Sequence, residues 1–132
     1  MISSNAVRFI LIDDDPINNF ICESILRICA IGAPVKAFTN PQLAIDYIRD
    51  NYPLADGEKT ILLLDINMPV LNGWNVLDKL AGVTLGSFIT YMLTSSIDMK
   101  DKEKAEQNPM VSGFIEKPLD LEPFSALIKQ HM

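Results

Sequence analysis

The sequence is poor in the residues that build disulfide frameworks, metal–thiolate centres and histidine-based active sites. It contains two cysteines and one histidine in 132 residues. Cys22 and Cys29 are seven positions apart in a predicted helix, so roughly 10 Å of helix axis separates them, beyond the roughly 7 Å limit on a disulfide's Cα separation. We expect both to be buried free thiols. One histidine, His131, expected at a frayed helix end, excludes a histidine-based triad or metal site.

Basic runs and long apolar runs are also absent. The formal net charge is -6, which argues against non-specific binding to nucleic acid, because a phosphate backbone demands clustered Lys and Arg. The apolar stretches are about as long as a β-strand and too short to cross a bilayer. Residues 1–5 lack the charged start and apolar core of a signal peptide. We expect a cytoplasmic protein that binds neither nucleic acid nor membrane.

The hydrophobic pattern predicts one globular domain over residues 1–132, with its core at about residues 7–131. Hydrophobic residues make up 48% and charged residues 21% of the chain. The pattern alternates between short apolar runs and helical periodicity, which is typical of strands followed by crossover helices. Strands are predicted at residues 7–12, 35–38, 61–64, 88–93 and 113–116. Helices are predicted at about residues 16–30, after Asn40, after Gly73, at about residues 98–107 and, as a last helix, across Leu121 to Ile128, with loops at residues 51–59 and 82–86.

Each predicted helix should bury one apolar face. The side chains expected to face the core are Ile17, Phe20 or Ile21, Ile25 and Ile28 in the first helix; Leu43, Ala44, Tyr47 and Ile48 in the second; Val76, Leu77 and Leu80 in the third; and Leu121, Phe124, Leu127 and Ile128 in the last. Met99 and Ala105 are almost the only apolar residues of the fourth helix. That helix should therefore bury little area and be the most weakly held element.

Five strand–helix units with right-handed crossovers predict an α/β fold. We expect a three-layer, doubly wound, five-stranded parallel sheet. We infer the strand order 2-1-3-4-5, in which a ligand crevice lies between the first and third strands, outside their carboxyl ends.

Charged or hydroxyl side chains follow four of the predicted strands. They are Asp13-Asp14, Asp65, Thr94-Ser95 and Lys117. Parallel strands bring such residues to one edge of the sheet, so we expect them to meet in the crevice. Three carboxylates repel one another, which predicts a cation, and an all-oxygen ligand set suits Mg²⁺ or Mn²⁺. Asp14 and Asp65 are the expected direct ligands, with Asp13 acting through water.

The same residues suit phosphoryl transfer. Aspartate carboxylates form acyl-phosphate intermediates, so Asp65 can act as a nucleophile on phosphorus. The transition state spreads charge over three equatorial oxygens, which the metal ion, the Lys117 ammonium and the Thr94 hydroxyl can each meet.

Four motifs resemble those of the receiver domain of two-component response regulators. They are Ile12-Asp13-Asp14, Leu64 to Pro69 with Asn72-Gly73, Leu93-Thr94-Ser95, and Glu116-Lys117-Pro118. The resemblance covers nearly the whole chain and implies a flavodoxin-like sheet. It also implies that Asp65 accepts a phosphoryl group from a sensor histidine kinase or a histidine phosphotransfer protein, with Mg²⁺ required and Mn²⁺ as an alternative.

Carried over by position, the resemblance assigns further roles. Asp13 and Asp14 form the acid pair, Asn67 offers its backbone carbonyl to the metal ion, and Thr94 and Lys117 contact the phosphoryl oxygens. Phe114 is the expected switch aromatic, which turns inward when Thr94 moves and so reshapes the face formed by the fourth helix, the fifth strand and the last helix. The Lys117-Pro118 bond resembles one that is cis in the family.

The resemblance implies a signalling phosphoacceptor rather than a turnover enzyme. We expect a stand-alone receiver without an output domain, a monomer or weak homodimer, acting on a downstream protein that the sequence does not identify. The alternatives are a phosphatase of the haloacid dehalogenase type, a flavodoxin-like cofactor binder, and a receiver that is never phosphorylated. Asp13-Asp14-Asp15 matches the DxD of the phosphatases, but Ile17 stands where they carry Thr or Val. We expect Asp15 to cap the first helix.

Overall fold

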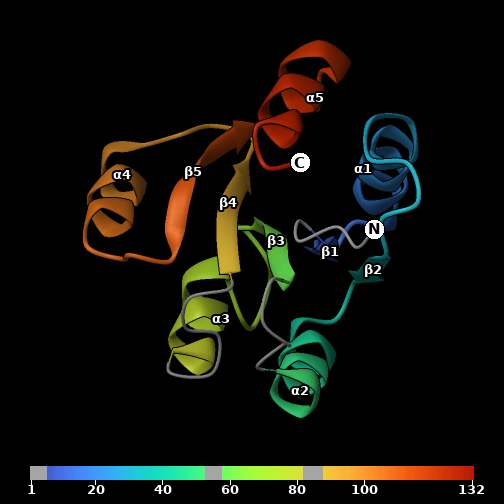
Figure 1. The fold of residues 1–132 in the computed structure, drawn as a ribbon. Coiled ribbons are helices and arrows are strands. Elements are labelled where there is room, and N and C mark those ends of the chain that lie inside the picture. The colour runs from blue at the N-terminus through green and yellow to red at the C-terminus, as the bar shows by residue number, and fades with distance from the viewer. Residues whose placement is uncertain (1–5, 53–57, 82–87) are drawn as a thin grey trace.

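A parallel five-stranded sheet forms the centre of the computed structural model, which describes residues 6–52, 58–81 and 88–132 (Figure 1). Its strands are β1 (Ala6–Ile12), β2 (Val35–Phe38), β3 (Glu58–Asp65), β4 (Phe88–Thr94) and β5 (Val111–Glu116). Their order is β2-β1-β3-β4-β5, and every neighbouring pair is parallel. The predicted α/β fold and strand order are confirmed.

Helices cover both faces of this sheet, which gives the three predicted layers (Figure 1). They are α1 (Pro16–Cys29), α2 (Pro41–Asn51), α3 (Gly73–Leu80), α4 (Met99–Glu106) and α5 (Leu121–Lys129). One buried cluster joins α1 and α5 to the sheet, and a second joins α2 and α3 to its opposite face.

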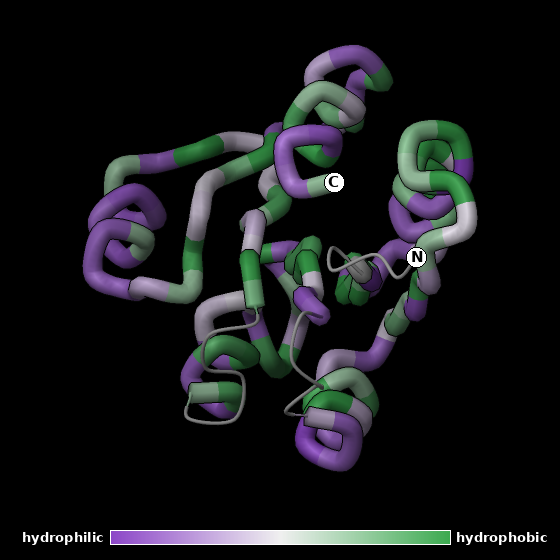
Figure 2. Tube along the Cα trace, viewed as in Figure 1, coloured by the Kyte–Doolittle hydropathy of each residue, from purple (hydrophilic) through white to green (hydrophobic). Residues whose placement is uncertain are grey.

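Alternating side chains of the inner strands supply both clusters. Ile10 and Ile12 of β1 point to the α2 and α3 side, whereas Phe9 and Leu11 point to the α1 and α5 side. Successive residues of a strand face opposite ways, so a strand covered on both sides must be apolar at every position. This explains the unbroken apolar runs in the sequence, which Figure 2 shows as green segments along the strands.

Side-chain caps define where four of the helices begin. Asp15 accepts a hydrogen bond from the Ile17 backbone N–H, and Asn40 caps α2 in the same way, each followed by a proline at the first helical position. Asn72 begins α3 as part of a capping box, and Asp98 caps α4. Such caps satisfy backbone N–H groups that the helix itself leaves unpaired. The predicted capping role of Asp15 is confirmed.

The inward face predicted for α1 is largely wrong. Ile17 and Phe20 are 67% and 72% exposed, and Ile28 is also exposed. The residues that α1 buries are Asn19, Cys22, Ile25 and Leu26. The helix has apolar residues around most of its circumference. The periodicity of the sequence was therefore not enough to predict which side of α1 packs against the sheet.

Smaller corrections apply to α2 and α5. Leu43 is exposed, and Ile45 takes its place in the core beside Ala44 and Ile48. In α5, Phe124 and Ile128 are buried but Leu121 is exposed. The inward face predicted for α3 is confirmed, because Val76, Leu77 and Leu80 are all buried.

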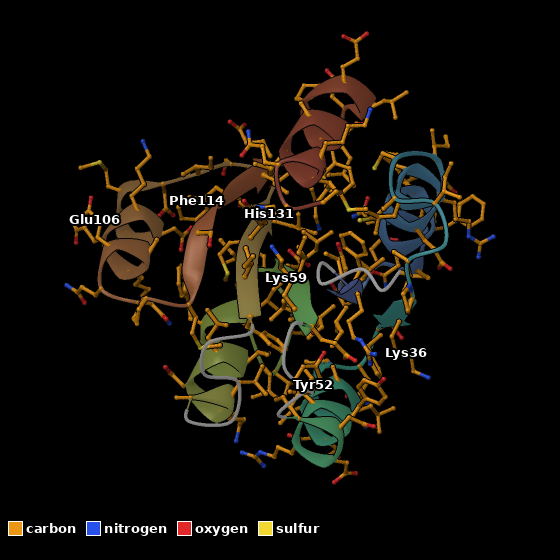
Figure 3. All side chains as sticks on the ribbon, viewed as in Figure 1. Lys36, Tyr52, Lys59, Glu106, Phe114 and His131 are labelled. Carbon is orange, nitrogen blue, oxygen red and sulfur yellow. The ribbon has the colours of Figure 1, made fainter. Side chains whose placement is uncertain are left out.

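Two further expectations concern the rare residues. Both cysteines are free, but only Cys22 is buried and Cys29 is partly exposed. Burial raises the pKa of the Cys22 thiol to about 12, which makes it unreactive. His131 is not frayed, because its ring packs against Tyr91 of β4 and its Nε2 lies 2.6 Å from the Tyr91 hydroxyl (Figure 3).

Parts of the predicted loops, residues 53–57 and 82–87, lie outside the described residues, as do residues 1–5. Among the residues that are described, none of the helices combines the length and the apolar character needed to cross a bilayer.

Candidate functional site

The carboxyl ends of β1 and β3 lie side by side and bring the predicted acidic residues together. These strands are hydrogen-bonded neighbours up to Ile12 and Leu64, so Asp13 and Asp65 follow paired positions. Carboxylate oxygens of Asp13, Asp14 and Asp65 lie within 4.8 Å of one another. Asp13 and Asp65 are buried, at 1% and 4% exposed, whereas Asp14 is exposed.

Lys117 reaches this acidic group from the end of β5. Its Nζ atom lies 2.7 Å from Asp13 Oδ2 and 3.3 Å from Asp65 Oδ1. Its backbone N–H donates to the Thr94 carbonyl, which ties the ends of β4 and β5 together. Burial lowers the pKa of Lys117, but the ion pairs with the two aspartates outweigh this effect and leave the pKa raised. The ammonium is therefore charged and points at the predicted acceptor.

Asp65 is the carboxylate whose surroundings most disfavour its charge. Burial and the neighbouring Asp13 charge raise its pKa from 3.8 to about 6. The Lys117 ammonium and the Asn67 backbone N–H, which donates to Asp65 Oδ1 at 3.2 Å, act in the opposite direction. A positive ion beside Asp65 would bring this pKa down from its raised value, because an opposite charge favours the ionised form.

These side chains line an open crevice of about 370 Å³. Its lining residues are Asp13, Asp14, Asp15, Asn18, Asp65, Asn67, Ser95 and Lys117. Asn18 was not predicted from the sequence. It could have been predicted from its position, because Asn18 lies four residues after Asp14, in the first turn of α1 beside the crevice.

Thr94 lies at the end of β4 but is not among the residues that line the crevice, and its hydroxyl is hydrogen-bonded to Ser96. Oγ1 donates to the Ser96 carbonyl at 2.8 Å and accepts from the Ser96 backbone N–H. The side chain is almost fully buried, at 1% exposed. A hydroxyl has one proton to donate, so Thr94 could donate to a group bound to Asp65 only by giving up its hydrogen bond to the Ser96 carbonyl.

Phe114 lies on β5 beside α4, as its label in Figure 3 shows. It is half-buried and packs against the cluster on the α2 and α3 side. Phe114 lines two grooves, one shared with α4 residues and one with α5 residues.

The loop after β3 is held close beneath Asp65. The Gly73 backbone N–H donates to the Ile66 carbonyl at 2.9 Å. A Cβ atom at Gly73 would lie 2.7 Å from the Asp65 carbonyl oxygen, closer than atoms pack. The turn before it includes Val70, which has a positive φ of 69° and is fully exposed. Glycine at position 73 thus allows α3 to begin directly behind Asp65.

The donor set fits a divalent cation of the Mg²⁺ type. All three converging side chains offer oxygen atoms, which hard cations prefer. Asp13 Oδ2 faces Lys117 and receives no other hydrogen bond among the described residues, so it is available to a metal-bound water. The Lys117-Pro118 peptide bond next to the site is cis, as the sequence resemblance implied.

Comparisons with known proteins agree with this geometry. The family model described as the response regulator receiver domain matches residues 9–129. A curated relative, the two-component response regulator ORR41 of Oryza sativa subsp. japonica, is 24% identical over 92% of this chain and 91% of its own length.

Solved structures are similar over nearly the whole chain. A response regulator receiver protein from Dyadobacter fermentans is 29% identical with a TM-score of 0.79, covering 96% of this chain and 98% of that one. A two-component response regulator from Cytophaga hutchinsonii is 28% identical with a TM-score of 0.78, covering 96% of each chain.

Proposed function

Because the chain belongs to the response regulator receiver family, we propose that Asp65 accepts a phosphoryl group from a phosphohistidine donor in a Mg²⁺-dependent reaction. The donor is a sensor histidine kinase or a histidine phosphotransfer protein. The observation that carries this proposal is the placement of the Asp65 carboxylate, in an open crevice beside two further carboxylates and 3.3 Å from the Lys117 ammonium.

The reaction is a direct transfer between two nucleophiles. A carboxylate oxygen of Asp65 forms a bond to phosphorus as the bond from phosphorus to the donor's imidazole nitrogen breaks, and the imidazole leaves with the electron pair of that bond. Lys117 balances charge on one phosphoryl oxygen, and backbone N–H groups at the strand ends can meet another.

Asp14 and Asp65 would hold the metal ion directly, Asp13 through water, and Asn67 through its backbone carbonyl. When bound, the ion supplies positive charge for the acceptor and the phosphoryl oxygens. The protein's own contribution is to hold the acceptor in the open crevice and to limit the effect that burial and Asp13 have on its charge. The Asn67 backbone N–H and Lys117 both favour the charged form of Asp65.

Phosphorylation would change the surface through Thr94. The new phosphoryl group would draw its hydroxyl away from the Ser96 carbonyl, vacating space toward which Phe114 can turn. A bound group shifts a conformational equilibrium only if it interacts more favourably with one of the two conformations. Here the favoured conformation would be the one in which Thr94 and Lys117 contact the phosphoryl oxygens. The face formed by α4, β5 and α5 would carry the signal to a separate protein.

The phosphatase alternative has less support. It needs both Asp13 and Asp15 in the crevice as a catalytic pair, but an oxygen of Asp15 is engaged in capping α1. The expectations that the receiver stands alone, is a monomer or weak homodimer and is cytoplasmic stay predictions.

Intact mass spectrometry tests the acceptor. After incubation with Mg²⁺ and acetyl phosphate, a small acyl-phosphate donor, the wild type should gain one phosphoryl mass and Asp65→Asn none. Asp15→Asn is the matched control, because it alters an exposed carboxylate of the same crevice while keeping an oxygen for the cap, and it should be labelled like the wild type. Equal labelling of Asp65→Asn and the wild type would show that another residue accepts the phosphoryl group.

A further inference from the structure

One polar side chain lies in the otherwise apolar face that α1 presents to the sheet. Asn19 is 7% exposed, and its buried companions on the helix are Cys22, Ile25 and Leu26. Burying an amide costs free energy unless its polar atoms are hydrogen-bonded. The contacts of Asn19 therefore indicate what its burial achieves.

The Asn19 side chain joins the ends of two strands. Its Nδ2 donates to the Asp13 carbonyl at 3.0 Å and to the Phe38 carbonyl at 3.1 Å. The Phe38 carbonyl also accepts from the Asp13 backbone N–H. Asp13 is thus bonded to the end of β2 directly through its N–H and indirectly through the amide of Asn19.

This anchor acts on the peptide group that links the two acidic residues. Pairing of β1 with both neighbouring strands ends at Ile12, so Asp13 and Asp14 lie just beyond the ladder. The Asp13 carbonyl belongs to the same planar peptide group as the Asp14 N–H. Fixing that plane sets the direction in which the Asp14 side chain leaves the backbone.

The acidic residues need such an anchor because they repel one another. Asp13, Asp14 and Asp65 bring their oxygens within 4.8 Å of one another, and Asp14 is exposed. Without an anchor, repulsion would favour conformations in which the Asp13–Asp14 turn moves away from Asp65. Binding of a cation would then have to bring the Asp13–Asp14 turn back toward Asp65, and the free energy needed for this movement would weaken the cation's affinity.

We propose that Asn19 is a positioning residue for divalent-cation binding, holding the Asp13–Asp14 peptide against the end of β2 so that both carboxylates face Asp65. Asn19 does not touch the cation. It acts like the outer-shell groups of metal sites, whose loss typically weakens metal binding about 10- to 100-fold. This inference rests on the proposed metal site and adds a residue outside it.

The test is isothermal titration calorimetry of the unphosphorylated protein with Mg²⁺. Asn19→Leu keeps a side chain of similar size but removes both donated hydrogen bonds, and its Kd for Mg²⁺ should rise about tenfold. Asn51→Leu is the matched control. Asn51 also donates Nδ2 to a backbone carbonyl, that of Tyr47, but at the far end of α2, and its loss should leave the Kd unchanged.

A second readout separates positioning from general stability. In labelling with acetyl phosphate, Asn19→Leu should need about tenfold more Mg²⁺ for half-maximal rate yet reach a maximal rate close to that of the wild type. A merely structural role would lower the urea midpoint measured in EDTA without this selective shift. If Asn19→Leu fails to fold, Asn19→Ser, which keeps one hydroxyl donor, should show a smaller shift in the same titration.

The outcomes are distinguishable. A folded Asn19→Leu that binds Mg²⁺ as tightly as the wild type overturns the role of Asn19 and leaves the acceptor site standing. A wild type that gives no Mg²⁺ binding overturns both the metal site and this inference. If Asn51→Leu loses as much Mg²⁺ affinity as Asn19→Leu, the proposed role of Asn19 is also overturned, because the effect would then not depend on contacts at the strand ends.

Discussion

At the scale of single residues, Asp65 is held where its charge is costly. Burial and Asp13 raise its pKa to about 6, above its ordinary 3.8, although Lys117 lies beside it. A folded state that binds the proton more tightly than the unfolded chain is favoured at low pH, and this advantage is lost as pH rises from about 4 to 6. At neutral pH without metal, the ionised Asp65 carboxylate therefore destabilises the fold.

Asp65→Asn should accordingly stabilise the metal-free protein. We expect its free energy of unfolding at pH 7.5 in EDTA to exceed that of the wild type by about 1–2 kcal/mol, with the difference shrinking toward pH 4.5, where the wild-type carboxyl is protonated. Urea denaturation at both pH values measures this. The exposed Asp15→Asn should show no such gain, and a destabilised Asp65→Asn would contradict the argument.

Gly73 is a second residue at which a small change should have a large effect. Gly73→Ala places a Cβ atom against the Asp65 carbonyl oxygen and the Met92 side chain, and only the latter can move easily. We expect a loss of about 1–3 kcal/mol in thermal or urea unfolding, the usual cost of overpacking a core. Gly32→Asn is the control, since nothing lies near that glycine's Cβ position and Asn tolerates its positive φ. Equal stability of Gly73→Ala and the wild type would show that the loop can yield.

At the scale of elements, α4 differs from the other helices. None of its residues is buried, and it is predominantly hydrophilic in Figure 2. Its polar attachment to α3 runs through Trp74, whose indole N–H donates to Asp101 at 3.0 Å while the Lys104 ammonium lies 5.7 Å from the ring centre. A helix held by so few contacts can shift at low cost, as the proposed change of the α4, β5 and α5 face requires.

Trp74→Phe should loosen α4 selectively. It keeps an aromatic ring but removes the indole donor and weakens the contact with the Lys104 ammonium. We expect amide hydrogen exchange in residues 99–106 to accelerate about fivefold, equivalent to about 1 kcal/mol, with β3 and β4 unchanged. Asp101→Asn, which keeps an acceptor oxygen, should have a smaller effect. Uniform acceleration across the sheet would instead mean global destabilisation.

At the scale of the whole molecule, the sheet connects two buried clusters and ends at the acidic crevice. β3 lies at its centre, is covered on both faces and carries Asp65 at its last position. The acid pair, Asp13 and Asp14, directly follows β1 beside it. A cation held between the two strand ends would therefore stabilise the entire fold rather than one loop, because the native arrangement alone assembles its ligands.

Mg²⁺ should raise the melting temperature of the wild type. At a concentration about 100 times its Kd, the stabilisation is about 2.7 kcal/mol, or roughly 10 °C for a chain of this size. Differential scanning calorimetry with and without Mg²⁺ measures this, with Asp14→Asn expected to lose most of the gain and Asp15→Asn to retain it. Equal gains in all three proteins would place the cation elsewhere.

The sequence by itself determined the strand order, the three layers and the meeting of Asp13, Asp14, Asp65 and Lys117. The reason is that covered parallel strands must be apolar throughout, and residues that follow such strands necessarily gather at one edge of the sheet. The sparse apolar content of α4 likewise predicted its lack of burial, because a helix cannot bury side chains that it does not have.

Tertiary structure alone decided which side of α1 meets the sheet and what the side chains of Thr94, Asn19 and Trp74 contact. Ile17, Phe20 and Ile28 are as apolar as the residues that α1 buries, so only packing against β1 and α5 separates the two faces. The hydroxyl and amide contacts join groups on different turns and strands. Their partners are set by distances in the folded chain, which hydrophobic periodicity does not encode.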